Sequence, residues 1–133
     1  MMEEFQMSDL GEMAYFLAME INQMQQGIFI CQQKYAVEIL KKFDMQNCKP
    51  ISTPLVQNAK LTKNDGAALI DQNKYRSLIG CLLYLSTTRP DIMFVVSLLS
   101  RFMHLPSELH FKVAKRMLRY VKGTTSYGVA FFK

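Results

Sequence analysis

The sequence predicts an α+β fold, with an N-terminal β-hairpin and helix, a connector, and a helical second half that ends in a strand. Three observations support this class: two short apolar runs near the N-terminus, apolar residues at helical spacing further on, and a stretch without periodicity in the middle. Hydrophobic residues make up 50% of the 133 residues and charged residues 20%, an ordinary globular composition that argues against intrinsic disorder.

The first predicted elements are a hairpin and an amphipathic helix. Residues 14–21 and 27–31 are rich in aromatic and β-branched residues, and a polar link ending in Gly27 joins them, which predicts two paired strands. Residues 33–43 then show a helical period, because apolar side chains recur on one face while lysine and glutamate take the others. The apolar set is Ala36, Ile39, Leu40 and Phe43.

Residues 47–71 lose this periodicity and are predicted to form the connector. So long a stretch either lies across a surface or joins two subdomains. Residues 1–70 hold six Lys/Arg and eight Asp/Glu, whereas residues 71–133 hold ten and three, so the charge changes sign near this stretch. The change favours a joining role, and we predict an N-terminal region of residues 1–46 and a helical region of residues 72–133.

The second half is predicted to hold about three helices. The first has apolar residues at helical spacing, namely Tyr75, Leu78, Ile79, Leu82 and Leu83. Gly80 inside it indicates close approach of another backbone, because glycine costs a helix about 1 kcal/mol relative to alanine. The later helices are predicted to start at Pro90 and near Pro106, and Gly123 is typical of a helix end. Residues 127–132 predict a last strand with no later segment to pair with, as expected of a truncated domain.

The strongest functional signal lies in the predicted helix of residues 109–122. Five basic residues gather within about 120° of its surface, opposite the apolar face. They are Lys112, Lys115, Arg116, Arg119 and Lys122. The alternatives are a solvated outer face, which usually mixes both signs of charge, and a membrane-surface helix, whose apolar face would be bulkier. Contact with the phosphate backbone of a nucleic acid is a further interpretation, about as well supported as the solvated face.

No catalytic or metal-ligating constellation is visible in the sequence. His104 and His110 are off the i, i+4 spacing of a helical metal pair, so a surface or boundary role is favoured for both. The chain has no adjacent aspartates, no glycine-rich phosphate loop and no CxxC pair. Its three cysteines fit a reducing, intracellular setting, cytoplasmic or nuclear, and no apolar run reaches the ~20 residues that span a membrane.

A series of motifs runs along nearly the whole chain. They are Asp9-Leu10-Gly11-Glu12, Tyr15-Phe16-Leu17-Ala18-Met19-Glu20-Ile21, Gly27-Ile28-Phe29-Ile30-Cys31-Gln32, Cys48-Lys49-Pro50-Ile51-Ser52-Thr53-Pro54, Tyr75-Arg76-Ser77-Leu78-Ile79-Gly80, Thr88-Arg89-Pro90-Asp91-Ile92 and Lys115-Arg116-Met117-Leu118-Arg119-Tyr120. Together they resemble the reverse transcriptases of copia-type LTR-retrotransposon Pol polyproteins. The order of several long motifs makes this resemblance more specific than any one of them.

The resemblance implies a partial reverse-transcriptase fold: the end of the palm, the thumb and the start of the connection to RNase H. The catalytic Tyr-x-Asp-Asp turn, the Mg²⁺ ions of the parent polymerase and the RNase H acids would lie outside this chain. The partners implied are a primer–template duplex and the missing palm, fingers and RNase H parts. Tyr15, Phe16, Leu17 and Ala18 are similar to the family's primer grip, with Ala18 where the family pattern has glycine.

Three functional hypotheses follow. The first is a fragment of an RNA-directed DNA polymerase that positions the primer–template and is inactive alone, because it lacks the catalytic aspartates. The second is a stand-alone, non-catalytic nucleic-acid-binding helical module. The third is a helical interaction domain whose charge serves only solubility.

Overall fold

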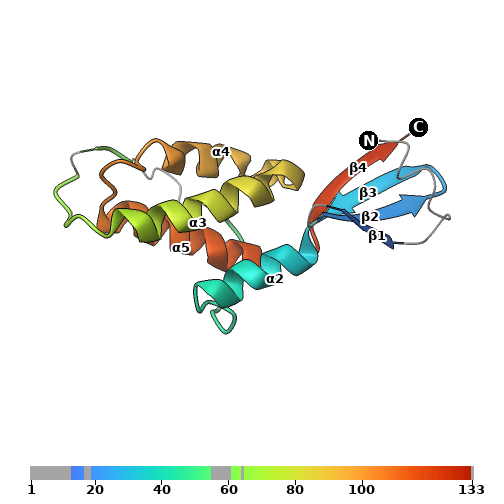
Figure 1. Cartoon of the computed structure of the whole chain (residues 1–133), viewed down its shortest axis with the longest axis horizontal. Helices are drawn as coiled ribbons and strands as arrows, with labels where there is room; N and C mark the ends of the chain where they lie inside the picture. Colours follow the sequence, from blue (N-terminus) through green and yellow to red (C-terminus); the bar gives the residue numbers. More distant parts are fainter. Residues whose placement is uncertain (1–12, 17–18, 55–60, 64, 133) are drawn as a thin grey trace.

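The computed structural model describes residues 13–16, 19–54, 61–63 and 65–132, and it confirms the predicted α+β class. A four-stranded antiparallel sheet projects from one end of a group of packed helices (Figure 1). The sheet order follows the chain: β1 (Met13–Phe16), β2 (Met19–Met24), β3 (Gly27–Cys31) and β4 (Gly128–Phe132). The first three strands therefore precede the helices, and the chain returns to the same sheet in β4.

The predicted hairpin is present as β2 and β3, which pair antiparallel from Met24↔Gly27 to Glu20↔Cys31. Its first strand was predicted with the wrong bounds, however. Residues 14–21 contain the end of β1 and the start of β2, which pair with each other through Phe16↔Met19. The apolar character continues through both strands, so composition alone could not reveal the reversal between them.

Strand β4 is not left unpaired, which corrects the expectation for the last strand. It pairs antiparallel with β3, from Gly27↔Phe132 to Cys31↔Gly128. The glycines at both ends of this pairing permit a close approach, because a Cβ at Gly27 would collide with the Phe131 carbonyl and one at Gly128 with the Ile30 carbonyl. About a hundred residues separate the two strands, so no local pattern could predict the pairing.

The helices lie close to their predicted positions. They are α2 (Gln33–Lys42), α3 (Gln72–Leu85), the short 3₁₀ helix η1 (Ser86–Thr88), α4 (Pro90–Ser100) and α5 (Glu108–Lys122). One core joins all four α-helices, with Ala36, Leu78, Ile92 and Leu118 each completely buried. Burial of a leucine or isoleucine side chain is worth about 1.5–3 kcal/mol, so this shared core holds α2 against the helices of the second half.

Local signals fix several helix ends. The Asp71 side chain accepts a hydrogen bond from the backbone N–H of Asn73 at the start of α3, and Pro90 opens α4. Gly123 follows α5 as predicted, but its φ of −85° is ordinary, and a Cβ there would lie 3.1 Å from the Pro50 Cβ. The close approach predicted at Gly80 is not seen, since a Cβ there would meet no described atom within 4 Å.

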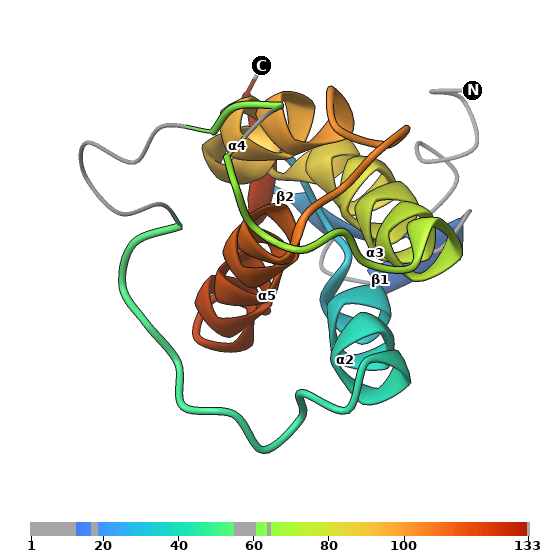
Figure 2. The same cartoon turned by 90° about the vertical axis from the view of Figure 1, so that its left-hand side faces the viewer.

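The connector lies against α5 at two places. In Figure 2 the first described part of the connector leaves the end of α2, and its last part leads into the start of α3. At the first place the Ile51 N–H donates to the Arg119 carbonyl at 3.4 Å, and at the second the Glu108 N–H donates to the Ala68 carbonyl at 2.8 Å. The connector thus lies across a surface, and the three-part division of the chain stays a prediction.

Candidate nucleic-acid interface

The two faces of α5 differ as the sequence predicts. Ala114, Met117, Leu118 and Val121 are completely buried in the core. The basic face of α5, our name for the five basic side chains predicted above, points away from that core. Of these, Lys112 and Lys115 are exposed, while Arg116, Arg119 and Lys122 are partly buried. The helix therefore presents a row of cations of unequal accessibility.

The three partly buried cations bind the connector and the residue that precedes it. The Arg116 Nη2 donates to the Thr53 hydroxyl at 3.0 Å, and the Arg119 Nε donates to the Lys49 carbonyl at 2.9 Å. Lys122 donates through its Nζ to the carbonyl of Gln46. All these acceptors are neutral oxygens, so none of them offsets the positive charge of these side chains.

Among the described residues, no carboxylate forms an ion pair with the basic face of α5. Arg89 and Asp91 form such a pair elsewhere in the described part of the chain, and neither residue belongs to that face. Lys115 instead lies 5.2 Å from the centroid of the Phe111 ring, a contact that leaves its charge in place. A row of uncompensated cations on a helix attracts the phosphate groups of a nucleic acid.

A buried ion-paired cluster that the sequence did not predict surrounds Arg89. We name it the Arg89 cluster; it comprises Arg89, Asp91, Tyr120, Thr124 and Tyr127. The guanidinium, 1% exposed, donates to both carboxylate oxygens of Asp91 at 2.9 and 2.8 Å. It also donates to the carbonyl and hydroxyl oxygens of Thr124 at 3.1 and 2.7 Å. An arginine beside an aspartate at a helix start was the only signal that could have revealed it.

The Arg89 cluster shifts the ionisation of its members. Burial alone would raise the pKa of the Asp91 carboxyl, but the hydrogen bonds from Arg89 and Tyr120 and the charge of Arg89 outweigh it and lower the pKa below 3.8. Burial, together with the hydrogen bond that the Tyr120 hydroxyl donates to Asp91 at 2.7 Å, raises the pKa of Tyr120 to about 12. At neutral pH the cluster therefore holds one paired charge of each sign.

His110 is completely buried, which corrects the surface or boundary role predicted for it. Its Nδ1 accepts from the Ser107 N–H at 3.0 Å, so its Nε2 carries the proton and donates to the Thr62 carbonyl at 2.8 Å. The Ser107 hydroxyl donates to Asp65 at 2.6 Å, and this bond is the first cause that lowers the pKa of the Asp65 carboxyl. His110 thus caps the start of α5 and binds the connector. The helical periodicity around His110 predicted neither of these two contacts.

The residues similar to a primer grip are only partly described. Tyr15 and Phe16 lie in β1, opposite Glu20 and Met19 of β2. Leu17 and Ala18 lie outside the described residues. The pairing places this segment at an edge of the sheet, and its role as a primer grip stays a prediction.

The described acidic residues do not fit the Mg²⁺ that the resemblance implies for the parent enzyme. No three His, Cys, Asp or Glu side chains in this part of the chain come together to hold a metal ion. The carboxylates instead have structural partners: Glu20 accepts from the Lys34 N–H at 2.7 Å, Asp71 caps α3, and Asp91 pairs with Arg89. We therefore assign no step of a reaction to a metal held by these residues.

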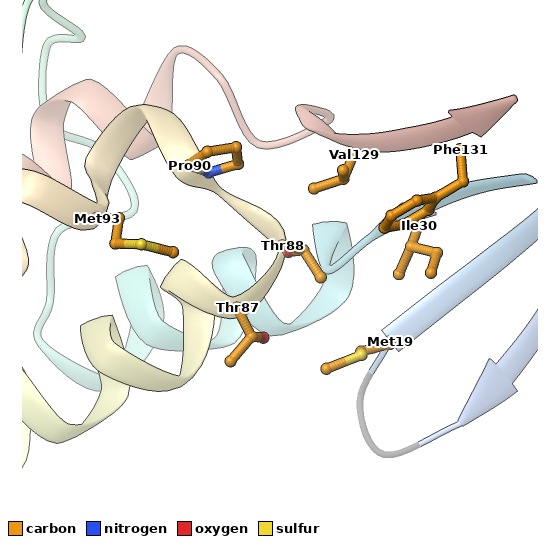
Figure 3. A pocket seen from close by; sticks show the side chains of 8 residues that line it. All are labelled: Met19, Ile30, Thr87, Thr88, Pro90, Met93, Val129 and Phe131. Carbon is orange, nitrogen blue, oxygen red and sulfur yellow. The ribbon is translucent and has the colours of Figure 1, made fainter. Parts of the chain in front are cut away.

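An apolar hollow of about 250 Å³ separates the sheet from the start of α4 (Figure 3). Met19, Ile30, Val129 and Phe131 line it from the sheet, and Thr87, Thr88, Pro90 and Met93 from the helices. The hydroxyls of Thr87 and Thr88 both donate to the Gln32 side-chain oxygen. No charged side chain lines this hollow, so it does not share the phosphate chemistry of α5.

The chain is similar to reverse transcriptases and to retrotransposon polyproteins. Residues 1–57 match the family model of reverse transcriptase (RNA-dependent DNA polymerase). The chain is 39% identical to the retrovirus-related Pol polyprotein from transposon RE1 of Arabidopsis thaliana and 36% identical to that from transposon TNT 1-94 of Nicotiana tabacum, over 96% and 92% of its length. It is also 43% identical over 97% of its length to an uncharacterized mitochondrial protein of Arabidopsis thaliana.

The matched relatives are longer than this chain. It spans 9% and 10% of the two polyproteins and 53% of the mitochondrial protein. No solved structure matches the chain. No helix in the described part of the chain has the length and apolar character needed to cross a membrane. Residues 1–57 therefore match the reverse transcriptase family, and nearly the whole chain is similar to a short segment of retrovirus-related Pol polyproteins of retrotransposons.

Proposed function

We propose that this chain is a portion of an RNA-directed DNA polymerase that holds the primer–template duplex by its phosphate backbone and performs no chemistry of its own. The observation that carries the proposal is the uncompensated row of cations on α5. A B-DNA duplex carries one phosphate per ~1.7 Å of its axis, so a straight helix with cations on successive turns can contact several phosphates at once.

The accessible end of this row is the best place for the first contact. Lys112 and Lys115 are exposed, and neither has a hydrogen bond to the described part of the connector. Arg116 and Arg119 each use one N–H group on the connector and keep further donors for a phosphate. The duplex would therefore lie along α5 with the connector beside it.

The other parts of the proposal come from the relatives. The residues similar to a primer grip, Tyr15, Phe16, Leu17 and Ala18, would contact the primer end, and the catalytic aspartates with their Mg²⁺ would come from the rest of the polyprotein. The partners are then a primer–template duplex and the remaining polymerase and RNase H parts, in an intracellular compartment. Positioning of this kind can contribute strongly to phosphoryl transfer without supplying a reacting group.

A salt titration of duplex binding tests the proposal. The logarithm of the binding constant for a fluorescent primer–template duplex should fall linearly with the logarithm of the salt concentration. The Lys112→Gln/Lys115→Gln double variant should lower that slope by about two, because each lost phosphate contact removes about one released counterion.

The matched control is Lys63→Gln, which removes one exposed charge from the connector and should leave the slope unchanged. If the wild-type chain binds no duplex at low salt, the proposal is wrong. That result would favour the hypothesis of a helical interaction domain whose charge serves only solubility. The purified chain should also show no Mg²⁺-dependent primer extension, and extension by the chain alone would contradict a non-catalytic role. An in-frame upstream segment encoding Tyr-x-Asp-Asp would favour the polymerase portion over a stand-alone binding module.

A further inference from the structure

A second hollow, of about 430 Å³, opens where the connector crosses the end of α5. Pro50, Ile51 and Ser52 form one wall, and Tyr120 and Tyr127 lie on the other. The wall positions are fixed, because the Ile51 N–H donates to the Arg119 carbonyl and Pro50 packs against Gly123. The hollow exists only because two segments distant in the sequence meet here.

Tyr127 gives this hollow an aromatic face. Its side chain is 52% exposed, although it lies in a short link between α5 and β4. The Arg89 guanidinium lies 5.2 Å from the centroid of the Tyr127 ring. The backbone N–H of Tyr127 donates to the Thr124 carbonyl at 3.0 Å. An accessible ring held in place by a buried cation can stack on a planar ligand at a small cost in side-chain entropy.

The charges around the hollow are positive. Lys49 precedes Pro50 and is exposed, and Arg119 and Lys122 belong to the basic face of α5 that continues from the rim. The nearby carboxylate of Asp91 is paired with Arg89 and accepts a hydrogen bond from Tyr120. A ligand with a planar ring and a phosphate would therefore find complementary chemistry for both groups at this one place.

We propose that this hollow binds an unpaired nucleobase stacked on Tyr127, with the adjoining phosphates on Lys49, Arg119 and Lys122. The inference rests on the proposed function, since it extends the phosphate contacts of α5 to a single-stranded segment. Aromatic rings beside a basic groove are the general means by which proteins hold single strands, because every base offers a π-face. The occupant is thus a single-stranded extension of the duplex, of either DNA or RNA.

The experiment compares a blunt duplex with the same duplex carrying a single-stranded extension, using the purified chain and fluorescence anisotropy. Tyr127→Ala should weaken binding of the extended duplex by about 5- to 150-fold, the range found for loss of one stacked base. Binding of the blunt duplex should change less than twofold. Tyr127→Phe, which keeps the ring, should behave like the wild type. Extensions made of DNA and of RNA form separate arms that identify the preferred strand.

Two further measurements guard against a folding defect. Ser52→Leu should narrow the hollow while Arg89 and Tyr127 are kept, and it should produce the same selective loss. A 2-aminopurine placed in the extension should be quenched on binding to the wild type and not to Tyr127→Ala. Phe94→Ala removes a 72% exposed ring on α4 and serves as the control, which should leave binding and quenching unchanged.

The outcomes separate this inference from the proposed function. If the wild type binds neither substrate, the proposed function is wrong and the nucleobase site fails with it. If duplex binding is normal but Tyr127→Ala and Ser52→Leu bind the extended duplex as the wild type does, only the nucleobase site is wrong. Equal weakening of both substrates by Tyr127→Ala, with Ser52→Leu unchanged, would also contradict it.

Discussion

The Arg89 cluster and the basic face of α5 use their cations in opposite ways. In the cluster the guanidinium is buried, pairs with a carboxylate and uses its donors on fixed oxygens. On α5 the cations are at least partly exposed, and those with recorded hydrogen-bond partners donate to neutral oxygens. A buried, paired cation contributes to the fold, whereas an exposed cation without a carboxylate remains available to a phosphate.

The largest expected effect comes from breaking the buried pair. Arg89→Met should lower the free energy of unfolding by about 3 kcal/mol, because it removes the cation paired with the Asp91 carboxylate and the donor to the Thr124 oxygens. Urea denaturation followed by circular dichroism measures the change. The control is Arg101→Met, an exposed arginine after α4, which should change the stability by less than about 0.5 kcal/mol. Equal losses of stability in both variants would show that the buried Arg89 contributes no more to the fold than an exposed arginine.

Removal of one hydroxyl from the cluster should have a smaller effect. Tyr120→Phe deletes the hydrogen bond to Asp91 and keeps the ring over Arg89. We expect a loss of about 1.5 kcal/mol, the low end for a hydrogen bond to a charged group, since Asp91 is partly exposed. The same denaturation experiment on Tyr35→Phe, a half-buried ring on α2, shows whether the loss belongs to the cluster.

Acid should weaken the Arg89 cluster as well. The pKa of the Asp91 carboxyl is lower in the folded chain than in the unfolded chain, so the unfolded state takes up its proton first as the pH falls. The contribution of Asp91 is therefore complete above its unfolded pKa and is lost as the pH falls from about 4 through the lower folded value. Denaturation between pH 5 and 2 should show a smaller decline for Asp91→Asn. A decline as steep as that of the wild type would assign the acid sensitivity to other groups, with Asp65 the next to test.

The smallest effect on stability is expected at the basic face of α5. Thr53→Ala removes the neutral acceptor of Arg116 and should cost less than about 0.5 kcal/mol, because exposed polar contacts contribute little. A double-mutant cycle with Arg116→Gln should give a coupling energy near zero. A coupling above about 1 kcal/mol would show that Arg116 acts mainly as a structural tie of the connector.

Much of the helical part could be predicted from residue spacing. The apolar positions of α2, α3 and α5 follow the helical period, and Pro90 and Ser107 mark helix starts, because these signals act within a few residues. The split of residues 14–21 between two strands escaped this reasoning, because strand propensity is the same on both sides of the reversal.

The candidate sites were less predictable than the elements that carry them. The basic face of α5 follows directly from helical geometry. Its engagement with the connector does not, since Arg119 and Lys49 are seventy residues apart. His110 likewise reads as an ordinary helical residue, and only the packing of Thr62 and Ser107 against it shows a buried cap.

The sequence by itself determined the α+β class, the helix positions and the gathering of five basic residues on one helix face. Periodicity and capping depend on neighbouring residues, so the chain carries that information locally. The tertiary structure alone decided the pairing of β4 with β3, the burial of Arg89 and His110, and the course of the connector along α5. These features depend on contacts between distant segments, whose free energy arises from packing and desolvation that no local pattern records.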